Sequence, residues 1–112
     1  MAHDDIHVLM YKVLVYLYGC MKRGIRPDEE KISCGGDLFQ GIPHAYWIQV
    51  MRELVDKDLV RGIAVFYSDD APSVIIHDPS VTLEGVEFMQ ENTMMRKAAR
   101  FLKEVKDATP FA

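Results

Sequence analysis

The sequence predicts a mainly α fold with one small β-hairpin, an α+β arrangement within a single domain that spans residues 1–112. An amphipathic helix pattern over residues 43–58 is followed by two short apolar strands within 60–77, and a further helix begins at 83. Helix, hairpin and helix in this order are typical of a winged helix-turn-helix domain, here with an extra C-terminal helix. Many DNA-binding proteins use this scaffold, but a scaffold alone does not identify the ligand.

The composition indicates a protein with its own hydrophobic core and an acidic surface. Of the 112 residues 49% are hydrophobic, and the net charge at pH 7 is −4. An acidic balance is unfavourable for binding DNA, because Lys and Arg neutralise the phosphates. No apolar run reaches the length of a membrane span, and residues 1–5 lack the basic start of a signal peptide. We therefore expect a cytoplasmic protein that does not enter a membrane.

The first half of the chain contains one long helix pattern and one short one. The long pattern covers residues 5–19 and has apolar residues on two faces, which predicts a helix buried between two partners. One partner is the helix-turn-helix core. The other is either the C-terminal helix or a second copy of the chain. Residues 28–33 form a short helix candidate before Gly35-Gly36, and residues 37–42 read as a turn.

Residues 43–81 carry the helix and the hairpin that define the scaffold. Pro43 suits the first turn of a helix whose apolar stripe comprises Trp47, Ile48, Met51, Leu54 and Val55. The strands are expected at 63–67 and 74–77, joined by a polar turn at 68–72 and ended by Asp78-Pro79.

Two helices complete the predicted fold. Thr82 can cap a helix over 83–91, and Thr93 can cap the last helix, over 94–107. Met94-Met95 and Phe111 lie on or near this terminal helix, where exposed apolar residues often form an interface. A homodimer through the first and last helices and simple packing of these helices within one chain are both consistent with this pattern.

Several segments of the chain resemble the YjcQ-like family of small winged-helix proteins from bacteria and their phages. The resemblance is carried by Phe66-Tyr67-Ser68-Asp69-Asp70-Ala71-Pro72, Val81-Thr82-Leu83-Glu84-Gly85, residues 54–62, residues 91–98 and residues 101–107. It implies a winged-helix fold. It does not imply an activity or any site residue, because the function of the family is poorly defined.

The leading functional hypothesis is DNA binding by a transcriptional regulator of bacterial or phage origin. The third helix would enter the major groove, where Arg and Gln side chains hydrogen-bond base edges. However, its charges balance, and Asp69 and Asp70 make the tip of the wing acidic. The residues expected near the bases are His44, Tyr46, Gln49 and Arg52, and those expected near phosphates are Lys22, Arg23, Arg96, Arg100 and Lys103.

Two other interpretations stay open. The acidic wing and the neutral third helix also suit a protein-interaction module that does not bind DNA, and a small-molecule pocket between the first and last helices is a third possibility. No cofactor, metal or catalytic residue is expected. The spacing of Cys20 and Cys34 does not fit a zinc site and indicates buried thiols, and His3 and His7 lack a third ligand.

Overall fold

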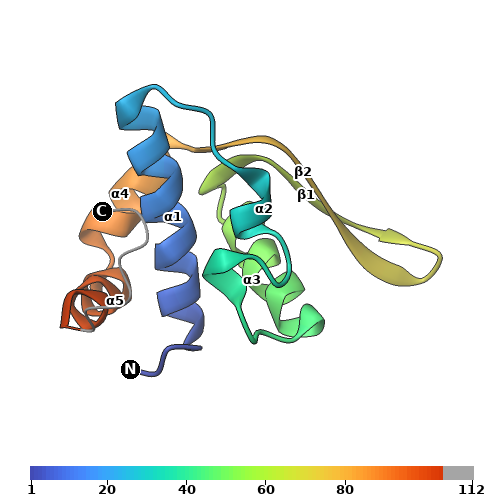
Figure 1. The fold of residues 1–112 in the computed structure, drawn as a ribbon, viewed down its shortest axis with the longest axis horizontal. Coiled ribbons are helices and arrows are strands. Elements are labelled where there is room, and N and C mark those ends of the chain that lie inside the picture. Colours follow the sequence, from blue (N-terminus) through green and yellow to red (C-terminus); the bar gives the residue numbers. More distant parts are fainter. Residues whose placement is uncertain (105–112) are drawn as a thin grey trace.

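The computed structural model of the protein describes residues 1–104 and shows a mainly α fold with one antiparallel β-hairpin (Figure 1). The order of the elements confirms the predicted fold class. In chain order, the described elements are α1 (Ile6–Arg23), α2 (Glu29–Ile32), the 3-10 turn η1 (Asp37–Phe39), α3 (His44–Asp56), β1 (Val60–Ser68), β2 (Ala71–Val81), α4 (Leu83–Glu91) and α5 (Thr93–Glu104).

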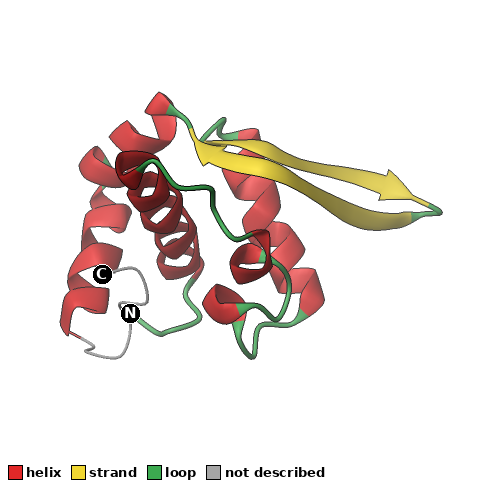
Figure 2. Ribbon diagram, turned by 45° about the horizontal axis from the view of Figure 1, so that its top comes forward, coloured by secondary structure: helices red, strands yellow, loops and turns green. Residues whose placement is uncertain are grey.

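Helix α1 is the centre of the molecule. Figures 1 and 2 show it between α4 and α5 on one side and α2 and α3 on the other. Its two apolar faces therefore both find partners within one chain. Val8 packs with Ala98 and Leu102 of α5 in a small separate cluster, and Met95 of α5 is fully buried in the main core. Phe111 lies outside the described residues.

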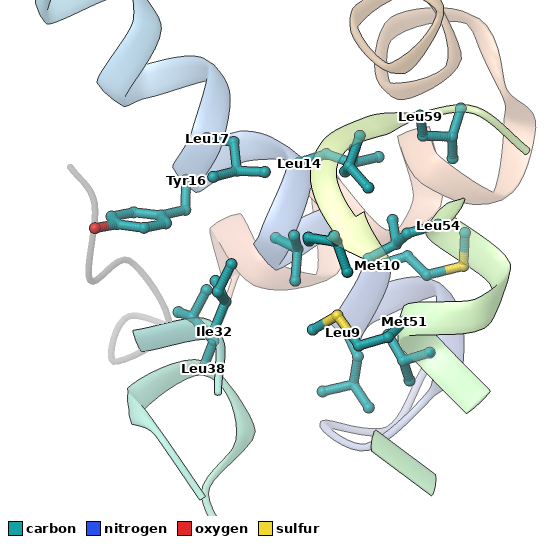
Figure 3. Packing of buried hydrophobic residues seen from close by; sticks show 14 of the residues in the cluster. Leu9, Met10, Leu14, Tyr16, Leu17, Ile32, Leu38, Met51, Leu54 and Leu59 are labelled. Carbon is teal, nitrogen blue, oxygen red and sulfur yellow. The ribbon is translucent and has the colours of Figure 1, made fainter. Parts of the chain in front are cut away.

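The main core lies between α1 and the helix-turn-helix elements (Figure 3). Leu9 and Leu14 of α1 meet Met51 and Leu54 of α3, and each of these side chains is at most 1% exposed. The predicted stripe of α3 is buried at Trp47, Ile48, Met51 and Leu54, but Val50 is also fully buried. Its burial widens the apolar face, since α3 also supports the hairpin that follows it.

Helix α1 is longer than the sequence pattern suggested, because Gly19 does not end it. The helix continues to Arg23 and ends at Gly24, which has a φ of 67° and donates its N–H to the carbonyls of Cys20 and Met21. Glycine adopts this left-handed conformation without the steric cost of a side chain. Lys22 and Arg23 lie in the last turn, where cations interact favourably with the helix dipole.

Helix α3 ends two residues earlier than predicted, at Asp56, because Asp58 leaves the helical conformation. Asp58 has a φ of 59° and donates its N–H to Val55, while Leu59 donates to Leu54 at 3.0 Å. This hydrogen-bond pair is the C-terminal cap that usually has glycine at the left-handed position. The cap turns the chain directly from α3 into the wing.

The hairpin, called the wing below, is longer than the predicted 60–77. Strand β2 continues through Asp78-Pro79 to Val81, so the expectation that Asp78-Pro79 ends the hairpin was wrong. The register shifts between Arg61 and Ile63, where Gly62 has a φ of 80°, and pairing resumes at Arg61 with Ser80. This bulge lets the ladder pass the proline, which has no N–H to donate. At the tip, Asp69 and Asp70 both have positive φ and form a tight two-residue turn.

Two side chains cap the last helices. Thr82 accepts a hydrogen bond from the N–H of Gly85 at 2.9 Å, as the sequence predicted for α4. The cap of α5 is Asn92 and not Thr93, since the Asn92 amide oxygen accepts from Met94 and Met95 at 2.9 and 3.1 Å. Helix α5 is described to Glu104, so residues 105–107 of the predicted helix lie outside the described residues.

Candidate functional site

The exposed side of α3 is the surface on which a winged-helix domain would present a recognition helix. Gln49 and His44 are exposed there, while Tyr46 and Arg52 are half-buried. The His44 ring lies against Trp47 with the ring centroids 5.7 Å apart, and Trp47 itself donates its indole N–H to the carbonyl of Ile32 at 3.0 Å. His44 is therefore packed against the start of the helix, and Gln49 points to solvent.

Tyr46 is engaged with the N-terminal segment of the chain. Its hydroxyl donates a hydrogen bond to the backbone carbonyl of Asp4. Burial raises the pKa of Tyr46, and the nearby charges of Asp4 and Asp5 raise it further. The hydroxyl is directed toward the N-terminal segment rather than away from the domain.

Arg52 connects α3 to the wing. Its guanidinium carbon lies 5.8 Å from the centroid of the Tyr67 ring on β1. A cation over an aromatic face is attracted by the ring quadrupole. Arg52 therefore helps to fix the wing against α3.

The wing has an apolar outer face that the sequence analysis did not single out. Paired residues of an antiparallel ladder lie on the same face, and successive pairs alternate between faces. The pairs Ile63–Ile76 and Val65–Val74 pack on the core, so Ala64–Ile75 and Phe66–Ser73 face outward. Ile75 is 54% exposed and Phe66 is 38% exposed. We call Ala64, Phe66 and Ile75 the apolar wing face.

The wing is fixed to the helix-turn-helix elements at its base. Asp78 forms an ion pair with Arg26, and its N–H donates to the carboxylate of Glu29 on α2 at 3.2 Å. Closer to the tip of the wing, Arg52 contacts the Tyr67 ring of β1. The apolar wing face therefore projects from the body in a defined orientation, as Figure 2 shows for the whole hairpin.

The helix-turn-helix and the wing are strongly acidic. Residues 28–81, from the N-cap of α2 to the end of β2, contain ten Asp or Glu and four Lys or Arg, a net charge of −6 with His neutral. The remaining residues contain seven acidic and nine basic side chains, a net charge of +2. The helix-turn-helix and the wing, which would approach DNA in this fold, thus carry the negative charge of the chain, although Asp78 is paired with Arg26.

Three of the basic residues expected to contact phosphates lie across α1 from α3, and the other two, Lys22 and Arg23, lie in the last turn of α1. Figures 1 and 2 show α5, which carries Arg96, Arg100 and Lys103, separated from α3 by α1. At the end of α1, Arg23 donates a side-chain N–H hydrogen bond to the Gly19 carbonyl at 3.4 Å. Lys22 lies 4.8 Å from the centroid of the Tyr18 ring. Tyr18 in turn lines a groove together with Arg96 and Arg100. Tyr18 therefore links Lys22 to the arginines of α5, and Arg96, Arg100 and Lys103 are separated by α1 from the helix that carries Gln49.

The remaining candidate residues are separated from one another. Cys20 is buried, but Cys34 is exposed, so the expectation of two buried thiols was wrong for Cys34. The His3 ring packs edge-on against Phe101, and His7 contacts Asp5 at 3.1 Å. Within residues 1–104, no three His, Cys, Asp or Glu side chains gather as metal ligands, and no helix has the length and apolar character to cross a bilayer.

Comparison with known proteins identifies the family of this chain. No curated protein and no solved structure matches it. Residues 11–108 match the family described as YjcQ protein, and this range includes most of α1 and all of the helix-turn-helix, the wing and α4. The match agrees with the segments that carried the resemblance in the sequence. The chain therefore belongs to the YjcQ family.

Proposed function

We propose that this protein is a protein-interaction module that uses its helix-turn-helix and wing to bind a basic partner protein. The observation that carries the proposal is the net charge of −6 over residues 28–81, combined with the exposed apolar wing face. The partner is a protein surface in which Lys and Arg side chains surround an apolar patch. The proposed role is binding in the cytoplasm, without catalysis.

The two features of this surface would contribute differently. Phe66 and Ile75 supply apolar area that can be desolvated, which is where most binding energy at interfaces arises. Asp69 and Asp70 at the tip supply negative charge, which accelerates association with a basic partner and disfavours acidic ones. The contacts of Arg26, Glu29 and Arg52 hold the wing in place, so little ordering is needed when the partner binds.

DNA binding, as in a transcriptional regulator, is the second candidate. It is favoured by the winged-helix order of the elements and by exposed Gln49 on α3, next to half-buried Arg52. It is disfavoured by charge, since non-specific affinity for DNA comes from cations that replace phosphate counterions. A carboxylate-rich wing would repel phosphates where most winged helices would attract them.

A pair of titrations on ¹⁵N-labelled protein separates the two candidates. The probes are random-sequence duplex DNA at low salt and a synthetic peptide of alternating Lys and Leu. We expect the peptide to shift the amide signals of the wing and the DNA to shift none. Saturable DNA binding that maps to α3 and is weakened by Gln49→Ala would overturn the proposal and establish the second candidate.

Matched variants show whether the apolar wing face is the binding surface. The double variant Phe66→Ala/Ile75→Ala removes apolar contact area and should weaken peptide binding about tenfold. Leu83→Ala removes an equally apolar side chain that is 73% exposed at the start of α4, and should leave binding unchanged. Equal losses in both variants would show that the peptide binds any exposed apolar side chain, which contradicts the proposal.

A further inference from the structure

The groove between α1, α4 and α5 combines an apolar floor with cationic and hydroxyl side chains at its edge. Its volume is about 430 Å³, which is within the usual range for small-molecule sites. It lies on the side of α1 that faces away from α3. We call it the basic groove, and it is lined by Tyr11, Val15, Tyr18, Met89, Gln90, Arg96, Ala99 and Arg100.

The spacing of the lining residues follows from the helices that carry them. Tyr11, Val15 and Tyr18 recur every three or four residues and form one stripe along α1. Arg96 and Arg100 are four apart and form a stripe on α5, which crosses α1 (Figure 1). The two stripes face one another because Val8 and Tyr11 pack on α5 through Ala98 and Leu102. The groove is thus a direct product of the α1–α5 packing.

The charge at the groove is positive and unbalanced. Among the described residues, neither Arg96 nor Arg100 forms an ion pair, and no carboxylate lines the groove. A second recess of about 220 Å³ next to it is lined by the same two arginines with Thr93 and Lys97. A guanidinium group is planar and carries several N–H donors, so two of them side by side can bind the oxygens of a phosphate or carboxylate.

The floor of the groove is suited to a flat apolar body. The Tyr11 ring and Met89 offer aromatic and thioether surface against which a ring can pack. Lys22 already lies 4.8 Å from the centroid of the Tyr18 ring and adds a further cation beside the groove. Burial raises the pKa of Tyr11, so its hydroxyl stays protonated and can donate a hydrogen bond at neutral pH. Gln90 adds an amide that can donate or accept.

We propose that the basic groove binds a small aromatic anion, with its ring on the tyrosine floor and its anionic group on Arg96 and Arg100. This site is separate from the wing and does not depend on the proposed function. A ligand here would contact α1, α4 and α5 together and would stabilise their packing, because it binds only the folded state.

The test uses phenyl phosphate as the probe, with phenol and inorganic phosphate as its two halves. We expect phenyl phosphate to bind more tightly than either half and to shift the amide signals of Tyr11, Tyr18 and Gln90. Benzoate shows whether a carboxylate can replace the phosphate, and binding of either anion supports the site. Inorganic phosphate binding as tightly as phenyl phosphate, or shifts that map elsewhere on the protein, would overturn the proposal.

Variants of α5 make the test specific. Arg96→Gln/Arg100→Gln should weaken binding of phenyl phosphate about tenfold, whereas Lys103→Gln should change it less than about twofold, because Lys103 is exposed outside the groove. Ala99→Leu fills the groove without altering charge and should also weaken binding. Equal losses in the Lys103 and double-arginine variants would indicate non-specific attraction by the helix and contradict the proposal. Thermal unfolding of each variant checks that the fold is retained.

Discussion

The guanidinium carbon of Arg52 lies 5.8 Å from the centroid of the Tyr67 ring, and this contact joins α3 to β1. The Tyr67 side chain is 66% exposed, so the contact is worth about 0.5–1 kcal/mol. Arg52 was expected to face a base pair. In the structure it faces the wing, and any ligand that recruits the arginine must first separate the two.

A double-mutant cycle measures this contact. Arg52→Ala and Tyr67→Leu should show a coupling free energy of about 0.5 kcal/mol in urea unfolding, because each single change removes the same interaction. Arg61→Ala with Tyr67→Leu is the control cycle, since Arg61 is exposed at the base of β1 and makes no cation–π contact among the described residues. A coupling near zero for the Arg52 pair would show that the wing is held without it.

Stability should fall as the pH rises above about 10. Burial raises the pKa values of Tyr11, Tyr16 and Tyr46 above the ordinary value of 10.0. Below pH 10 the three hydroxyls are protonated in both the folded and the unfolded chain, and their contribution to the free energy of unfolding is fully present. Above it the unfolded chain loses protons first, so the free energy of unfolding decreases until the folded-state pKa values are passed.

Urea unfolding between pH 8 and pH 12 checks this alkaline loss. Tyr11→Phe keeps the ring but removes one titrating hydroxyl, and burial is what shifts the pKa of Tyr11. Its decline above pH 10 should therefore be shallower than that of the wild-type protein. An unchanged slope in the variant would show that Tyr11 does not contribute.

Two glycines with similar backbone angles should respond differently to alanine. Gly24 has a φ of 67° with open space around it, so Gly24→Ala should cost about 1 kcal/mol for the left-handed backbone alone. Gly62 has a φ of 80°, and an added Cβ would overlap the His77 carbonyl and lie 2.7 Å from that of Asp78. Gly62→Ala should therefore cost clearly more and disturb the wing. Equal losses in thermal unfolding would mean that the bulge adjusts freely.

Substitution of Thr82 should destabilise the fold more than the same substitution of Thr93. Its hydroxyl donates to the Asp58 carbonyl at 2.7 Å and accepts from Gly85, and the side chain is 3% exposed. Thr82→Val leaves both partners without a hydrogen bond and should cost about 2 kcal/mol. Thr93→Val, the same change at an exposed position, should cost much less. Comparable losses would show that the hydroxyl bonds contribute little.

The elements with strong periodicity were predictable, and so were the bounds of α4, but the ends of α1, α3 and β2 were not. The apolar stripe of α3 and the Thr82 cap of α4 can be read from local spacing alone. Gly24 ends α1 and Asp58 ends α3 through left-handed backbone angles, which depend on how the next segment packs. The passage of β2 through Pro79 required the bulge at Gly62, and such bulges have no reliable sequence signal.

The site was less predictable than the fold. The charges of Asp69 and Asp70 and the acidic balance could be counted in the sequence, but the position of α5 relative to α3 required the packing of both on α1. The apolar wing face could have been found, because Ala64 and Phe66 alternate with the inward-facing Ile63 and Val65. The alternation of side chains along a strand was the signal for this face, and the register of the hairpin shows which of the two faces points outward.

The two-residue turn at Asp69 and Asp70 has a consequence for solubility. A two-stranded hairpin leaves both of its outer edges with unpaired backbone groups, and exposed apolar strands of this kind tend to pair with copies of themselves. If two wings aligned side by side with their tips together, four carboxylates would be brought close to one another. The acidic tip therefore disfavours this alignment of two wings, while it leaves the apolar wing face open to a basic partner.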